Sequence, residues 1–175
     1  MASPEGVLDV SIIAVAHFDN PLRPLATELL REALSLRKRC IMPLSTFLGA
    51  YHVLTRYLRV NRGMASKALR ETLTVRSPAF YCDIPIDLAV DSLDYAATYD
   101  VESWDGYLVG LAINLNAKVI YTLDEKLRKV REITVTNPFP VDIVKKYHRW
   151  LDEKLKEHKR TKPQRGLTRA IDKAC

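Results

Sequence analysis

Apolar residues follow two alternating patterns along the chain. Short continuous apolar runs predict five strands. The first, VLDVSIIAV from Val7 to Val15, is apolar almost throughout, as expected for a strand buried on both faces of a parallel sheet. The other four runs are RCIMP, AFYCDIP, AKVIYTL and ITVTNP. Between them, apolar residues at three- and four-residue steps predict helices over about 19–38, 45–60, 64–73, 87–99 and 103–115, and an amphipathic terminal helix over about 141–160.

The alternation of strands with helices predicts an α/β fold with a mostly parallel sheet. We expect one domain over residues 1–140, followed by a basic amphipathic helix and a flexible tail over residues 141–175. Open parallel sheets bind their ligands at the carboxyl ends of the strands. The candidate functional residues are therefore polar residues that follow a strand or open the next helix.

The charge of the chain is concentrated towards its C-terminal end. The net charge is +6, but residues 1–143 carry 16 Lys and Arg against 17 Asp and Glu, whereas residues 144–175 carry 11 against 4. A basic segment of this kind predicts a polyanionic partner. The sequence shows no secretory signal, no apolar run of membrane-spanning length and no C-x-x-C pair among its three cysteines. We therefore expect a cytoplasmic protein without a membrane contact or a zinc framework.

Three aspartates occupy positions from which they could meet at one edge of the sheet. Asp9 lies in the first apolar run, where an unpaired buried carboxylate would be costly. Asp105 lies in the first turn of a helix whose predicted N-cap is Ser103, and Asp124 follows the fourth strand. If the first and fourth strands are neighbours, the three carboxylates converge, and Mg²⁺ or Mn²⁺ would relieve their repulsion. Alternatively, each acid has a separate structural role at a helix start or against backbone amides.

Two blocks of sequence resemble the PIN-domain family, which includes the VapC-type toxin ribonucleases. They are VLDVSII near the N-terminus and SWDGYLVGLAINLNAKVIYTLDEKL near the C-terminus, and the resemblance covers about residues 5–140. It implies a three-layer α/β/α fold with five strands in the order 3-2-1-4-5. It also implies a metal-dependent endoribonuclease with Asp9, Asp105 and Asp124 as its catalytic and metal-binding acids. Ser11 and Thr122 match hydroxyls that accompany these acids; alternatively, they bond only to backbone at strand ends.

One position departs from the family pattern. Members normally have a glutamate early in the helix after the second strand, in a pattern like L-E-x-Y-x-V-L, whereas this chain has LGAYHVL with Gly49 in its place. No Asp or Glu lies between Pro43 and Arg70. Glu102, about one turn before Asp105, is a candidate substitute or a solvated helix-start charge. The hypotheses left open are an endoribonuclease, a degenerate PIN domain that binds RNA or protein without cutting, and another small α/β protein whose acids are structural.

Basic side chains after the last acid and on the terminal helix are candidate contacts to an RNA backbone. They are Lys126, Arg128, Lys129, Lys145, Lys146 and Arg149. For the first three, a solvated helix face is the alternative. The terminal helix could also bind a partner protein, and its apolar face is expected to dock on its own domain or on a second subunit. The partners implied by the resemblance are RNA, an antitoxin protein and a second copy of the chain.

Overall fold

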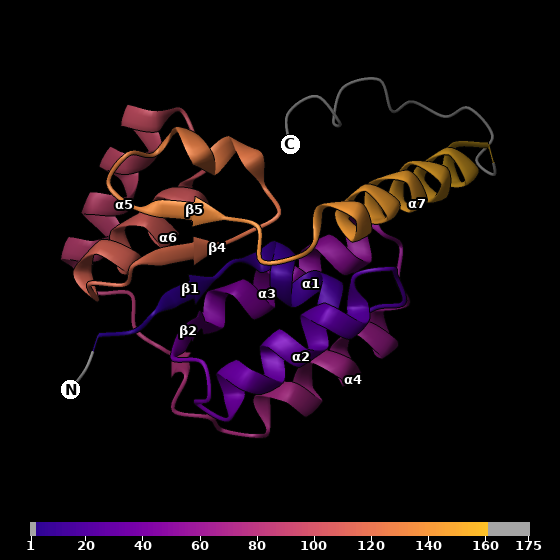
Figure 1. The fold of residues 1–175 in the computed structure, drawn as a ribbon, viewed down its shortest axis with the longest axis horizontal. Coiled ribbons are helices and arrows are strands. Elements are labelled where there is room, and N and C mark those ends of the chain that lie inside the picture. Colours follow the sequence, from indigo (N-terminus) through magenta and orange to yellow (C-terminus); the bar gives the residue numbers. More distant parts are fainter. Residues whose placement is uncertain (1–2, 161–175) are drawn as a thin grey trace.

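The computed structural model describes residues 3–160, which contain a sheet of five parallel strands (Figure 1). The strands are β1 (Gly6–Leu8), β2 (Cys40–Pro43), β3 (Phe80–Tyr81), β4 (Val119–Tyr121) and β5 (Thr134–Thr136). They lie in the order β3-β2-β1-β4-β5, and every pairing is parallel. The expected α/β class and strand order are confirmed. In particular, β1 and β4 are neighbours, with Leu8 opposite Tyr121.

Helices cover both faces of the sheet. They are α1 (Val10–Ala16), α2 (Arg23–Leu34), α3 (Leu44–His52) with a π-helical turn (Val53–Tyr57) that continues it, α4 (Arg62–Leu73), α5 (Ile86–Tyr99), α6 (Ser103–Asn114), a 3₁₀ turn (Glu125–Lys129) and α7 (Val141–Arg160). Side chains alternate between faces along a strand. Leu8 accordingly packs in one core with residues of α1 to α4 and α7, and Val7 packs in another with α5 and α6. The three-layer arrangement is confirmed (Figure 1).

The first apolar run is a short strand followed at once by a helix, and the prediction of one continuous strand was wrong. β1 ends at Leu8 and α1 begins at Val10, so Asp9 is the N-cap of the helix rather than a residue within a strand. Every side chain from Ile12 to Ala16 is buried. A fully buried helix has the same continuous apolar sequence as a buried strand, and periodicity does not distinguish them. The correction places Asp9 at the carboxyl end of β1.

One helix start and one N-cap also differ from the expected positions. α2 begins at Arg23 rather than near residue 19. The residues before it form a turn held by the buried side chain of Asn20, which hydrogen-bonds to three backbone groups. α6 begins at Ser103, and its N-cap is Glu102 rather than Ser103. The tail that was expected to be flexible, residues 161–175, lies outside the described residues.

The terminal helix α7 docks on its own domain, which is one of the two arrangements expected for its apolar face. Tyr147 is buried in the core that contains α1, and Trp150 and Leu151 pack against that core. The ring of Trp150 lies 5.6 Å from that of Phe18 and stacks on Tyr147 at 6.2 Å. Neither α7 nor any other helix within residues 3–160 is both long and apolar enough to cross a membrane.

Candidate functional site

Asp9 is held at the junction of β1 and α1 by four hydrogen bonds. Its Oδ1 accepts from the Val10 amide. Its Oδ2 accepts from the Ser11 amide at 3.3 Å, the Ser11 hydroxyl at 2.7 Å and the Thr122 hydroxyl at 2.7 Å. The Asp9 amide donates to the Tyr121 carbonyl at 3.0 Å, next to the β1–β4 pairing. Asp9 is buried, and these donors both offset the cost of burying its carboxylate and fix its orientation.

The hydroxyls of Ser11 and Thr122 connect Asp9 to the segment that follows β4. Each hydroxyl has one hydrogen, which it donates to Asp9, so the 3.4 Å contact between the two oxygens adds no further bond. Ser11 Oγ accepts from the Leu123 amide at 3.0 Å. Thr122 Oγ1 accepts from the Asp124 amide at 2.9 Å. The same two side chains therefore orient one acid and fix the backbone that carries another.

Asp105 lies in the first turn of α6, and electrostatics connect it to the other two acids. Burial, followed by the charges of Asp9 and Asp124, raises the pKa of the Asp105 carboxyl from 3.8 to about 7. Like charges raise a carboxyl pKa when they lie close to it in a poorly solvated place. Asp9 and Asp124 follow the neighbouring strands β1 and β4, and their charges act on Asp105; we call the surroundings of these three carboxylates the anionic region.

The residue after Asp105 allows α6 to cross α5 closely. A Cβ at Gly106 would lie 2.1 Å from the carbonyl oxygen of Ser92 in α5, a distance that no side chain tolerates. Glycine is therefore required for this crossing. The crossing in turn fixes the first turn of α6, which carries Asp105.

Asp124 follows β4 and caps the 3₁₀ turn. Its Oδ1 accepts from the Lys126 amide at 2.8 Å, and its side chain is half-buried. Among the side chains that the structure describes, residues 3–156, no three of His, Cys, Asp or Glu are gathered closely enough to hold a metal ion. The three aspartates thus lie within electrostatic range of one another without forming a coordination shell. Their chemistry fits a hard divalent cation, because all are carboxylates whose repulsion such an ion would relieve.

Gly49, which stands where the family pattern has a glutamate, lies in α3 against Val10. A Cβ at Gly49 would lie 2.9 Å from Cγ2 of Val10. The Val10 side chain therefore occupies the space into which a longer side chain at position 49 would extend. Glu102 is exposed, and its charge makes a small addition to those that raise the pKa of Asp105. Glu102 is thus a further carboxylate acting on the anionic region, but it comes from α6 rather than from α3.

The basic side chains predicted to contact RNA differ in how they are held. Lys129 Nζ donates to the Asp100 carbonyl at 2.6 Å, and Arg128 lies 3.5 Å from a carboxylate oxygen of Glu125. Both therefore have structural partners. Exposed side chains are found at Lys126, after β4, and on the first half of α7 at Lys145, Lys146 and Arg149.

An exposed aromatic side chain next to the acids was not among the predicted site residues. Trp104 precedes Asp105 in the first turn of α6 and is 57% exposed, which is unusual for a side chain of this size. The sequence signal for it was only its position beside an acid. That position does not reveal whether a tryptophan is buried or exposed.

Comparisons with known proteins agree with this architecture. The family model of the PIN domain matches residues 6–133. VapC20 of Mycobacterium tuberculosis, described as a sarcin–ricin loop cleaving toxin, has a TM-score of 0.55 and 15% identity over 72% of this chain and 98% of that one. PAE2754 from Pyrobaculum aerophilum has a TM-score of 0.53 and 18% identity over 87% of this chain and 99% of that one. At these identities the two structures show a shared fold. No curated protein matches the sequence.

Proposed function

The chain belongs to the PIN-domain family, and from this premise we propose that it is an endoribonuclease that hydrolyses RNA phosphodiesters with Mg²⁺ or Mn²⁺. The observation that carries the proposal is the environment of Asp105. Its pKa is raised to about 7 by burial and by Asp9 and Asp124. Gathering three mutually repelling carboxylates, of which Asp9 is buried and the other two are half-buried, costs stability, whereas a divalent cation between them would turn the repulsion into binding.

The residues divide the work of the site between them. When bound, a divalent cation supplies Lewis-acid activation of a water molecule and of a phosphate oxygen. Asp9, Asp105 and Asp124 would hold the cation. Ser11 and Thr122 keep the Asp9 carboxylate oriented through the hydrogen bonds they donate to it. Such supporting hydrogen bonds commonly matter for metal affinity as well as for orientation.

Family membership and the charge of the chain support RNA as the substrate class. The structural neighbour VapC20 is described as a toxin that cleaves the sarcin–ricin loop. Phosphate contacts would come from Lys126 and from the basic residues of α7, with smaller roles for Arg128 and Lys129. We further propose that the exposed ring of Trp104 stacks on a base near the scissile bond. By analogy with the family, the chain would act in the cytoplasm as a homodimeric toxin held in check by an antitoxin.

A cleavage assay with matched variants tests this function. The protein is incubated with mixed RNA in Mg²⁺, in Mn²⁺ and in EDTA, beside Asp9→Asn and Asp105→Asn. Asp142→Asn, an exposed acid on α7, is the charge-matched control. We expect cation-dependent cleavage that falls by more than about 100-fold in both site variants, beyond the roughly 10–100-fold typical when a residue that only hydrogen-bonds to a metal ligand is changed. Cleavage that persists in EDTA or in Asp105→Asn would contradict the proposal.

The second candidate function is binding of RNA without cleavage, and the Val10–Gly49 contact favours it. RNA that is retained in a gel shift but not cut in any metal would support this candidate. A calorimetric titration with Mn²⁺ then shows whether the missing acid is the cause. In that case Gly49→Glu combined with Val10→Ala, which makes room for the new side chain, should bind Mn²⁺ when the wild type does not. Equal binding by both proteins would exclude this explanation.

A further inference from the structure

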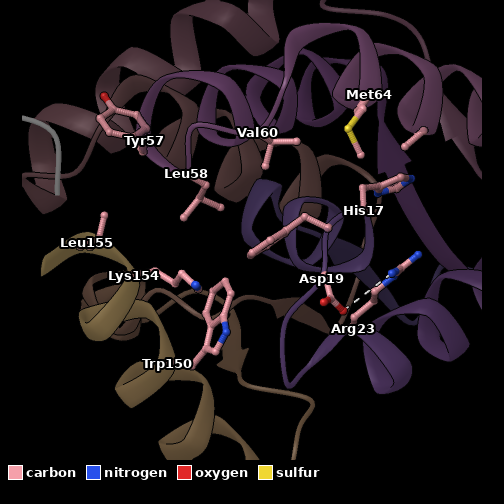
Figure 2. Close-up of a pocket in the computed structure, with 12 residues that line it drawn as sticks. His17, Asp19, Arg23, Tyr57, Leu58, Val60, Met64, Trp150, Lys154 and Leu155 are labelled. Atoms are coloured by element: carbon pink, nitrogen blue, oxygen red, sulfur yellow. Dashed lines mark ion pairs between the residues drawn. The ribbon is translucent and has the colours of Figure 1, made fainter. Parts of the chain in front are cut away.

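Two hollows lie along α4, and they differ in chemistry. The first is a cleft of about 410 Å³ between α7 and the segment that runs from the π-helical turn into α4 (Figure 2). Its lining is mostly apolar, with Phe18, Met64 and Trp150 among its members. The second hollow, of about 530 Å³, shares no lining residue with the first. It is lined by polar and small residues of α4 and the turn after it: Gly63, Ser66, Lys67, Arg70, Glu71 and Thr74.

The cations of the second hollow are open to a ligand. We call this hollow, together with Arg62 at the start of α4, the α4 basic face. Arg62 and Arg70 are exposed and form no ion pair among the side chains that the structure describes. Lys67 Nζ lies 4.0 Å from a carboxylate oxygen of Glu71, and both side chains are largely exposed. Exposed ion pairs of this kind are weak, so all three cations can turn to an external anion.

The two faces of the sheet carry opposite charge, which the nearly neutral total for residues 1–143 conceals. Residues 44–76, which contain α3 and α4, have six Lys and Arg against one Glu. Residues 83–105, which contain α5 and the start of α6, have seven Asp and Glu and no Lys or Arg. The first pair of helices packs in one core and the second pair in the other, on opposite sides of the sheet (Figure 1). A polyanion is therefore attracted to the side of α4 and repelled by the side of α5.

We propose that the α4 basic face binds the double-stranded part of a folded RNA. Arg62 and Arg70 are eight residues apart, or about 12 Å along the helix, so the cations of this face can contact several phosphates at once. Arginine suits phosphate oxygens. The hydroxyls of Ser66 and Thr74 can bond to a phosphate or to a ribose 2′-hydroxyl, and duplex RNA is bound mainly through such contacts. The choice of RNA over DNA rests on the proposed function, whereas the docking itself requires no cleavage.

The lining of the hollow favours duplex RNA over a single strand or an acidic protein. Proteins hold single strands by stacking the bases on aromatic rings, and none of the described residues that line the hollow is aromatic. Protein interfaces are anchored by large apolar or aromatic side chains, and the same described lining contains none. Contacts to a duplex backbone need only cations and hydroxyls, which are the groups that this face supplies.

Binding of two matched RNAs to the full chain in EDTA tests the proposal. One is a fluorescent RNA duplex of about 16 base pairs, and the other is an oligouridine with the same number of phosphates. The variant combines Arg62→Gln, Lys67→Gln and Arg70→Gln. By fluorescence anisotropy, we expect it to bind the duplex at least about tenfold more weakly than the wild type does, and the oligouridine less than about threefold more weakly. Equal losses for the two RNAs, or no loss for the duplex, would overturn the proposal.

A control variant removes the same charge from other parts of the surface. Arg37→Gln, Arg39→Gln and Lys118→Gln together replace three exposed cations that do not line the hollow, and they should weaken duplex binding by less than about threefold. The slope of log affinity against log salt should fall by about two to three in the α4 variant and stay unchanged in the control. Thermal melting checks that each variant is folded. Equal losses of duplex binding in the two variants would mean that only net charge matters, and the proposal would fail.

Competitors distinguish duplex RNA from other polyanions. A polyglutamate and a DNA duplex, each with the same number of charges as the RNA duplex, should displace the labelled duplex at least about tenfold less effectively than unlabelled RNA duplex does. Equal displacement by either competitor would overturn the assignment to RNA. Because these measurements exclude metal ions, they stand apart from the nuclease proposal: a chain that binds the duplex through α4 but cuts no RNA would support this inference and contradict that function.

Discussion

The two ends of α1 lie in opposite environments. The helix is seven residues long, or about 10 Å. Asp9 at its start accepts four hydrogen bonds and acts with Asp124 on the charge of Asp105, whereas His17 at its end lies in a mostly apolar cleft that Arg23 also lines. Burial raises the pKa of Asp105 near the first end and lowers the pKa of His17 at the second. Burial thus opposes charge at both ends of α1.

The two ends differ in whether a charged side chain is stabilised there. At the start of α1, which we call the acid end, Ser11, Thr122 and the first amides of α1 hold the Asp9 carboxylate in place despite its burial; the end of α1 at His17 is the cleft end. The region therefore carries an unbalanced negative charge that a cation can compensate. At the cleft end, the histidine is hydrogen-bonded in a way that suits the neutral ring, and the surface is suited to apolar contact. The comparison teaches that one short helix separates a site organised by charge from one organised by packing.

Asp105→Asn should give the largest effect, because it removes a carboxylate whose charge is disfavoured by burial and by Asp9 and Asp124. RNA cleavage should fall by more than about 100-fold. In contrast, the free energy of unfolding of the metal-free protein at pH 8 should rise by about 1–3 kcal/mol, after allowance for solvent screening. Site residues commonly reduce stability in this way. Urea unfolding in EDTA measures the gain.

The gain in stability should depend on pH with a definite sign. The pKa of Asp105 is raised from 3.8 to about 7, so between these values the folded state binds more protons than the unfolded state. Wild-type stability is therefore lost as the pH rises through this range. The advantage of Asp105→Asn should be complete at about pH 8 and nearly absent at about pH 4. An Asn variant that is less stable than wild type at pH 8 would show that Asp105 is not under repulsion.

The acid end could largely be predicted from the sequence, because parallel-sheet topology determines where strand ends lie. Once the alternation of strands and helices and the order 3-2-1-4-5 are given, Asp105 and Asp124 must come near the end of β1. The position of Asp9 as an N-cap could not be predicted, because the buried α1 has the composition of a strand. The contact between Val10 and Gly49 is likewise invisible in the sequence, since it depends on how α3 packs against α1.

The cleft end could not be predicted, because it arises from packing between distant segments. Residues 57–68 form one wall, and residues 150–155 of α7 form the other. The sequence predicted the amphipathic α7 and left open whether it docks on its own domain or on a second subunit. The apolar side chains of α7 do not show which surface the helix packs against. Nor does it show that Leu155, at the same helical spacing as Tyr147 and Leu151, remains partly exposed.

Trp150→Ala tests whether packing organises the cleft end, because it removes a large side chain from one wall of the cleft. The indole packs on Phe18 and stacks on Tyr147. Because the ring is only partly buried, its loss should lower the free energy of unfolding by about 2–4 kcal/mol, slightly less than for a fully buried tryptophan. Trp104→Ala, which truncates an exposed ring, is the matched control and should cost less than about 1 kcal/mol.

The same variant tests the expected domain boundary near residue 140. If residues 141–160 were a separable appendage, truncation of Trp150 would leave the main unfolding transition unchanged. If α7 is part of the folding unit, urea unfolding followed by circular dichroism should show one transition at a lower midpoint. We expect the single shifted transition.

Thr122→Val should have a smaller effect, centred on the support of Asp9. The substitution keeps the shape of the side chain but removes the donor to Asp9 Oδ2 and the acceptor of the Asp124 amide. Asp9 Oδ2 would keep its two Ser11 donors but lose its third, and the Asp124 amide would lose its acceptor, which together should cost about 1–3 kcal/mol of stability. Thr134→Val on β5, where the side chain is exposed, should change stability by less than about 0.5 kcal/mol. Equal effects of the two substitutions would show that Thr122 contributes no more than a surface threonine.

His17→Gln should have the smallest effect, which is a change in how stability depends on pH. A carbonyl only accepts, so His17 Nδ1 donates to Ile13, and Nε2 of the neutral ring then accepts from the Thr72 hydroxyl. Burial lowers the pKa of His17 below its ordinary 6.5, and the charge of Arg23 lowers it further against the opposing Ile13 hydrogen bond. The unfolded state therefore binds a proton more readily, and stability is lost as the pH falls below 6.5. In urea unfolding at about pH 7.5 and about pH 5.5, the wild type should lose more stability on acidification than His17→Gln. Asp105 makes stability change with pH in the opposite direction, but it is present in both proteins, so its effect cancels in their difference. Identical pH dependence of stability in the two proteins would show that the fold does not keep His17 neutral.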